Sequence, residues 1–251
     1  PVMGWGGGGK IIYPGVAGEK TVAYFHLVAS LYDENLYGLD TTPIRDMMEQ
    51  WVDSVGLDFI INVVLNAKAE IVDVVAGHYV KAHREGVRRG KEIVGFKVTE
   101  KADIMIASSH PADQDFWQSP KALYAAEAAV KGDRGGIMIL LSPNYEGVGP
   151  HPEYPKCMGR DDGDEAVREC ISGKTVDDPL ALAVGNSMSK LRRRRRLIVV
   201  SDGVSAEDMR QCGCEHYNVS EFQSLIDSLI AENPNCRIGA LSNGAETFLY
   251  E

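Results

Sequence analysis

The sequence has 251 residues, of which 44% are hydrophobic and 25% are charged, as is typical of a globular protein that can bury its own core. The formal net charge of −10 argues against general binding to nucleic-acid phosphates. With no membrane-length apolar run, no signal peptide and five cysteines without framework spacing, we expect reduced thiols in a cytoplasmic protein that binds neither nucleic acid nor membrane.

The start of the sequence is unusual. The first residue is Pro1 rather than methionine, and a glycine-rich segment over residues 4–18 follows almost at once. Such glycine density predicts a loop whose backbone can approach a ligand closely. We expect the chain to begin inside a longer protein, with part of the functional machinery elsewhere.

The first part of the chain then predicts helices and two strands. Thr42 is a good N-cap, and Pro43 suits the first position of the helix that follows it. Apolar periodicity predicts helices over residues 19–32, 44–55 and 77–92. Runs rich in Val and Ile predict strands over residues 58–65 and 70–76.

From about residue 95, short apolar strands alternate with helices, which indicates βαβ units and a parallel sheet. The expected strands cover residues 103–108, 136–142, 197–201 and 237–241. The expected helices cover residues 119–131, 163–171, 179–190 and 220–231, the last with Ser220 as N-cap and Gln223 in a capping box. We therefore predict an α/β fold with an incomplete α/β unit over residues 1–95. A Rossmann-like parallel sheet with flanking helices is expected over residues 96–251.

The glycine-rich loop partly matches a phosphate-binding P-loop. Gly4, Gly9 and Lys10 fit its first positions, but Ile11 follows the lysine, where the pattern needs a hydroxyl for Mg²⁺. No strand is expected before the loop, and Pro14 prevents a helix from starting directly after the lysine. These departures argue against a nucleoside triphosphatase.

A second group of polar residues follows a buried strand. Residues 107–121 read ASSHPADQDFWQSPK and open a helix, a usual place for ligand contacts in an α/β sheet. Gln118 and Lys121 are three residues apart, so we expect them to share one helix face near its N-terminus. An amide, an ammonium group and a helix N-terminus together suit a carboxylate. The alternative is an ordinary helix N-terminus with surface polar residues.

Two segments resemble the lactate racemase family, whose enzymes use a nickel pincer nucleotide. They are GWGGGGKIIYPGVAGEKTVAYFH at residues 4–26 and SSHPADQDFWQSPKALYAAEAAVKGDRGGIMILLSPNYEGVG at residues 108–149. The resemblance covers most of the chain and is thin from about residue 161 onward. It suggests the C-terminal part of a lactate racemase-like protein.

The resemblance implies a covalent cofactor, the nickel–pyridinium-3-thioamide-5-thiocarboxylate mononucleotide. Lys10 would hold it through a thioamide, and His26 would supply the fourth nickel ligand. A lysine amine is a suitable nucleophile, and Ni²⁺ accepts nitrogen and sulfur ligands in a square plane. Backbone amides of the glycine run would contact the nucleotide, at Gly7, Gly8 and Gly9. The alternative is a solvated Lys10 and a core His26.

The resemblance also assigns a substrate and a reaction. Gln118 and Lys121 would hold a 2-hydroxy acid, whereas Trp117 replaces a frequent tyrosine and supplies no hydroxyl contact. The reaction would be racemisation or epimerisation by reversible hydride transfer through a 2-keto acid, in a cleft between the two units. Residues 1–95 would then link the cofactor and residues 96–251 hold the substrate, with the last ten or so residues returning to the first unit.

Some features of the family have no counterpart here. Its two base histidines and its Asp-x-Thr-Arg phosphate motif lie upstream of the lysine and are not found. We therefore expect the chain alone to be inactive, and the cofactor-making enzymes to be its partners in the cell. A non-catalytic nucleotide-binding module and a regulatory fragment remain alternatives, and the substrate stays open between lactate, malate, a larger hydroxy acid and a sugar acid.

Two further patterns have structural interpretations. The five arginines at residues 192–196 fit a solvated turn between a helix and a strand better than an anion-binding patch. Cys212, Cys214 and His216 lack the spacing of a zinc site, so we interpret them as loop residues.

Overall fold

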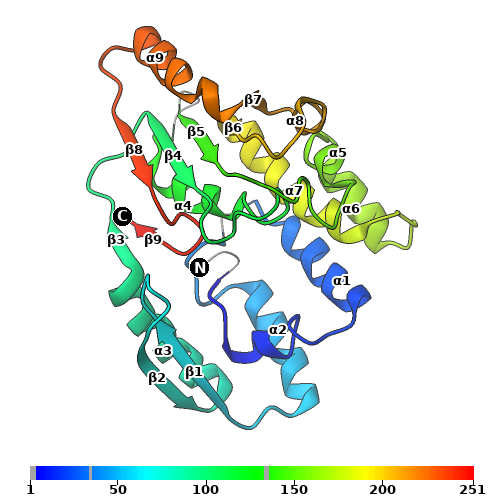
Figure 1. The fold of residues 1–251 in the computed structure, drawn as a ribbon. Coiled ribbons are helices and arrows are strands. Elements are labelled where there is room, and N and C mark those ends of the chain that lie inside the picture. The colour runs from blue at the N-terminus through cyan, green and yellow to red at the C-terminus, as the bar shows by residue number, and fades with distance from the viewer. Residues whose placement is uncertain (1–3, 34–35, 133–135) are drawn as a thin grey trace.

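The computed structural model describes residues 4–33, 36–132 and 136–251. Figure 1 shows two regions, a parallel sheet covered by helices and a smaller region built on a β-hairpin. No helix within the described residues is both long and apolar enough to cross a membrane. The predicted α/β fold class is confirmed.

The larger region is built on a five-stranded sheet in which every neighbouring pair of strands is parallel. In spatial order the strands are β7 (Glu215–Tyr217), β6 (Arg196–Val200), β5 (Ile137–Leu141), β4 (Ile104–Ser108) and β8 (Ile238–Leu241). The central strands are short apolar runs, as expected for strands buried on both faces. Four of the five strands were predicted, and β7 was missed because three residues give no periodic signal.

Helices cover both faces of this sheet. Met138 and Leu140 of β5 face one side, whereas Ile139 between them faces the other. The first face packs against α4 (Lys121–Ala129), α5 (Tyr154–Met158), α7 (Pro179–Arg194) and α8 (Ala206–Cys212). The second face packs against α9 (Phe222–Glu232), which Figure 1 shows in orange.

The smaller region contains the antiparallel hairpin of β1 (Ile60–Leu65) and β2 (Ile71–Gly77). Two helices accompany it, α2 (Pro43–Val55) and α3 (Tyr79–Val94). The Thr42 side chain accepts a hydrogen bond from the Arg45 N–H at 3.1 Å, which confirms the predicted N-cap. The C-terminus returns to this region, because β9 (Phe248–Tyr250) pairs in parallel with β3 (Gly95–Lys97).

Helix α1 (Glu19–Ser30) contacts both regions. Its Phe25 belongs to the same apolar cluster as α2, whereas Leu27 packs against α7 and α6 (Gly163–Ile171). The Asn186 side chain of α7 also donates to the Ser30 carbonyl at 3.1 Å. Because α1 precedes the hairpin in sequence but packs on the larger region, it brings residues from both parts of the chain together (Figure 1).

Two local predictions were wrong. Ser220 does not cap α9, because a 3-10 turn over Val219–Glu221 precedes that helix and Asn218 forms the capping interaction with Glu221. The arginine run does not form a turn, because α7 continues through Arg194 and β6 begins at Arg196. Its arginines pair with carboxylates of neighbouring elements, at Asp161, Glu127 and Glu215.

Candidate functional site

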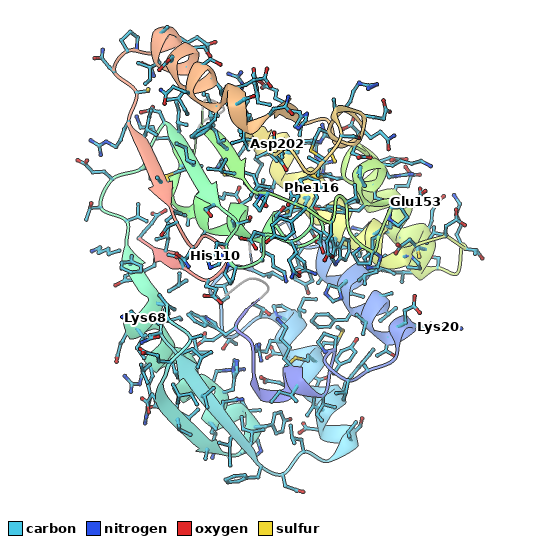
Figure 2. The ribbon with its side chains drawn as sticks, in the orientation of Figure 1. Lys20, Lys68, His110, Phe116, Glu153 and Asp202 are labelled. Carbon is cyan, nitrogen blue, oxygen red and sulfur yellow. The ribbon has the colours of Figure 1, made fainter. Side chains whose placement is uncertain are left out.

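A pocket of about 290 Å³ lies where α1 meets the sheet region. Its lining side chains come from α1, the turn before α4, and helices α4, α5 and α7. They are His26, Trp117, Gln118, Pro120, Lys121, Tyr124, Tyr154, Leu180, Ala183, Val184, Ser187 and Met188. Figure 2 labels Phe116, the residue before Trp117, beside this part of the molecule. The structure thus places His26 in the same pocket as the predicted substrate-binding residues Gln118 and Lys121.

Lys10 lies in a short 3-10 helix, η1 (Gly8–Ile11), and is half-buried. Its ammonium group donates to the Gly4 carbonyl at 3.5 Å. Burial, and then the positive charges of Arg45 and Lys121, lower the pKa of Lys10 from 10.5 to about 8. A substantial fraction of the amine is therefore neutral near pH 8, the form that acts as a nucleophile.

The glycine run before Lys10 packs tightly against β1 and α3. Gly7 and Gly8 have φ values of 76° and 60°, in the left-handed region that favours glycine. A Cβ on Gly7 would lie 2.8 Å from the Asn62 side-chain oxygen, and one on Gly8 would lie 2.9 Å from His83. The Gly8 N–H donates to Asn62 Oδ1 at 2.9 Å. The glycines therefore fix the position of the lysine, and their contact with a nucleotide stays a prediction.

His26 presents a neutral imidazole to the pocket. Its Nδ1 lies 2.8 Å from the Val22 carbonyl oxygen. Because a carbonyl only accepts, Nδ1 carries the proton and Nε2 keeps a lone pair. Burial lowers the pKa of His26, and the charges of Lys10 and Lys121 add to this effect. A neutral imidazole of this kind can ligate a metal ion. No group of three or more His, Cys, Asp or Glu residues able to hold a metal occurs in the part of the chain that the structure describes.

Gln118 and Lys121 lie next to each other at the start of α4. Gln118 lies in the turn before the helix, so the expected shared helix face is wrong in detail. The Lys121 ammonium nevertheless donates to Gln118 Oε1. The Gln118 N–H donates to the buried Asp115 carboxylate at 2.8 Å, which holds the turn in place. Burial lowers the pKa of Lys121, and Asp115 opposes this shift.

The sequence pattern pointed to Trp117 but gave no signal for Tyr124, Tyr154 or the α7 residues of the pocket wall. Trp117 packs on the His151 ring with 4.0 Å between ring centroids, and His151 Nδ1 donates to the Asp178 carboxylate at 2.7 Å. Tyr154 is fully buried and meets Trp117 edge-to-face. Residues of α7 form the rest of the wall, but their spacing resembles that of any buried helix, so the sequence carries no separate signal for them.

The cysteine and histidine pattern near the sheet edge has a structural explanation. All five cysteines are free thiols. Burial is the main cause that raises the pKa of both Cys212 and Cys214, which keeps these thiols protonated. The His216 ring donates through Nε2 to the Ser201 carbonyl at 2.9 Å. These contacts fasten β7 to the end of β6.

The family model and the curated relatives that match this chain agree with each other. Residues 98–244 match the family described as the lactate racemase C-terminal domain. The lactate racemase of Thermoanaerobacterium thermosaccharolyticum is 27% identical over 99% of this chain and 58% of its own length. That of Lactiplantibacillus plantarum is 28% identical over 81% of this chain and 48% of its own length. The chain therefore spans about half the length of these curated relatives.

Solved structures agree with the fold. The structure of the lactate racemase apoprotein from T. thermosaccharolyticum has a TM-score of 0.80 and 27% sequence identity. The match covers 100% of this chain and 60% of that chain. A Thermotoga maritima protein, 13% identical with a TM-score of 0.70, covers 97% of this chain and 62% of its own, and supports the fold alone.

Proposed function

Since this chain belongs to the lactate racemase family, we propose that it is the cofactor-linking and substrate-holding part of a 2-hydroxy acid racemase or epimerase. One observation carries the proposal. The pocket that contains Gln118 and Lys121 also contains His26, although His26 lies far from them in sequence. Lys10 is close enough to this group for its charge to lower the pKa of His26.

The residues at this site fit a nickel pincer nucleotide. Lys10 offers an amine with a lowered pKa for a covalent link, and His26 offers the Nε2 lone pair as a ligand for nickel. When bound, this group supplies a reversible acceptor for the hydrogen on C2 of the substrate. Proteins commonly tune such cofactors by positioning and electrostatics rather than by replacing their chemistry.

The chain's own residues hold the substrate. The Lys121 ammonium and the Gln118 amide bind the carboxylate of a 2-hydroxy acid, and the turn held by Asp115 orients both. The surrounding aromatic and aliphatic side chains exclude water, which strengthens these contacts. We assign no residue of this chain to the removal of the hydroxyl proton.

Mass spectrometry of the intact chain and its peptides, with a nickel assay, tests the cofactor proposal. The chain is purified from cells that make the pincer nucleotide. We expect an adduct on Lys10 and bound nickel. The K10R variant keeps the positive charge but loses the adduct, whereas K20R, at an exposed site in α1 labelled in Figure 2, retains it.

A second pair of variants separates attachment from metal binding. H26Q keeps the adduct on Lys10 but should retain nickel less tightly than the original chain, because the amide lacks the imidazole lone pair that would supply the fourth ligand. H110Q, at an exposed histidine, keeps both. An unmodified Lys10 without nickel would contradict the proposal and favour a nucleotide-binding module without a covalent cofactor.

A further inference from the structure

Two consecutive carbonyl groups of the glycine-rich loop are bound by buried side chains. The Arg45 guanidinium of α2 donates through Nη2 to the Trp5 carbonyl at 2.6 Å. His83 Nε2 of α3 donates to the Gly6 carbonyl at 3.1 Å. Arg45 and His83 are 4% and 3% exposed, so both contacts lie in a region of low dielectric, where hydrogen bonds are strong. The loop is therefore fixed to α2 and α3 just before Lys10.

Both contacts depend on one carboxylate, that of Glu49 in α2. Glu49 Oε1 lies 3.7 Å from Arg45 Nη1, and Oε2 accepts a hydrogen bond from Arg84 Nη2 at 3.1 Å. Arg84 Nη1 in turn donates to His83 Nδ1 at 3.0 Å. Because a guanidinium group only donates, Nδ1 accepts, and Nε2 carries the proton that is donated to Gly6. Glu49 thus reaches the loop by two arms, one through Arg45 and one through Arg84 and His83.

We propose that Glu49 is a positioning residue, which sets the place of the Lys10 amine through these two arms. This inference rests on the proposed function and deepens it, because it names the groups that hold the cofactor-linking lysine. The Glu49 side chain is 12% exposed, and so its ion pairs are shielded from water. Removing one partner of a shielded ion pair leaves the other charge uncompensated. Both arms should therefore lose their orientation when Glu49 loses its charge.

The position of the loop controls the reactivity of Lys10. Burial is the largest cause that lowers the pKa of Lys10 to about 8, and the charge of Arg45 is the second. A loop that moves away from α2 would expose the amine to water and separate it from Arg45. The pKa of Lys10 would then rise toward its ordinary value of 10.5. A network that only stabilised the fold would leave this pKa unchanged in every variant that stays folded.

Acylation of Lys10 across a pH series, followed by peptide mapping, tests the proposal. The 251-residue chain is purified from cells that do not make the pincer nucleotide. E49Q keeps the size of the side chain and removes its charge. We expect the midpoint of the pH profile to rise by at least about one pH unit, which slows acylation at pH 8 about fivefold. Loss of a negative charge would by itself lower the pKa of Lys10, so a rise reports that the loop has moved.

E85Q is the matched control for E49Q. Glu85 also pairs with two arginines, Arg88 and Arg89, but at an exposed place on α3. E85Q therefore removes the same charge from a similar pair of contacts away from the loop. We expect the midpoint for Lys10 to stay at the value of the original chain.

Two variants of His83 test the second arm without removing a charge. Burial and two arginine charges lower the pKa of His83 to about 3, so His83 is neutral throughout the pH series. H83Q places an amide N–H where Nε2 donates to Gly6, and the midpoint should stay near that of the original chain. H83L removes the donor and should raise the midpoint. Circular dichroism reports whether each variant is folded, and the His83 pair decides the test if E49Q does not fold.

An unchanged or lowered midpoint in folded E49Q or H83L, or an equal rise in H83Q and H83L, would overturn the inference. The adduct on Lys10 in chain from cells that make the pincer nucleotide tests the proposed function separately. An adduct together with an unchanged E49Q midpoint would support the proposed function and contradict the role of Glu49. A raised E49Q midpoint without any adduct in the original chain would support the role of Glu49 in holding Lys10 and contradict the proposed function.

Discussion

The five-stranded parallel sheet and the β1–β2 hairpin have similar strand sequences but different surroundings. The central strands of the parallel sheet and both hairpin strands are nearly continuous runs of Val, Ile and Leu. In the parallel sheet such side chains are covered on both faces, as with Ile139 and Leu140. In the hairpin only one face is covered, with Val64 and Val75 buried at 9% and 5% exposure.

The other face of the hairpin is apolar and open to solvent. Its side chains include Ile61, Val63 and Val74, which are 66%, 48% and 50% exposed. A hairpin with one solvated face normally alternates apolar and polar residues, whereas these strands do not. The comparison shows that an apolar run predicts a strand in both sheets. The run does not predict whether other elements pack on both faces of that strand.

Matched isoleucine substitutions give the largest expected effect. Ile198 of β6 is 0% exposed, so I198A should lower the free energy of unfolding by about 2–5 kcal/mol. I61A removes the same atoms from the open hairpin face and should cost less than about 1 kcal/mol. Urea unfolding followed by circular dichroism measures both. A similar loss for the two variants would show that the hairpin face is covered in solution.

Acid should weaken the hairpin region through His83 of α3. Burial and the charges of Arg45 and Arg84 lower the pKa of His83 from 6.5 to about 3. Below pH 6.5 the unfolded chain takes up a proton that the folded chain does not, so stability falls as pH drops from 6.5 toward 3. By pH 4.5 this contributes a loss of about 2–3 kcal/mol.

The H83Q variant isolates this contribution. An amide can still donate to the Gly6 carbonyl, which His83 Nε2 contacts at 3.1 Å, but it does not titrate. We expect the stability lost between pH 7 and pH 4.5 to be smaller in H83Q than in the original chain. Equal losses in urea unfolding at the two pH values would mean that His83 is not the acid-sensitive group.

The smallest expected effect concerns the electrostatic interaction between the two regions, through the pKa of Lys10. Lys121 of the sheet region lowers the pKa of Lys10, but less than burial and Arg45 do. Removing its charge in K121M should therefore raise the pKa of Lys10 slightly and slow acylation of this amine at pH 8. Peptide mapping after brief acylation across a pH series measures the shift, with the surface variant K131M as control. An unchanged Lys10 pKa would show that the two regions do not interact electrostatically.

The sequence by itself determined the local structure and the chemical character of the site. Thr42 and Pro43 marked the start of α2, and the apolar runs identified the hairpin and four strands of the parallel sheet. These features depend on neighbours a few residues apart, so a linear pattern contains them. The motifs around Lys10 and Gln118 likewise indicated the lactate racemase family, which the comparisons confirm.

Only the tertiary structure decided which residues come together at the candidate site and which side chains are buried. The packing of α1 on α7 brings His26 to Gln118, and α7 provides the apolar wall of their pocket. It also decided that the arginine run pairs with Glu127 and Glu215 rather than forming a solvated turn. These contacts join residues far apart in the chain, and their energy depends on how whole helices and strands pack, which no local spacing specifies.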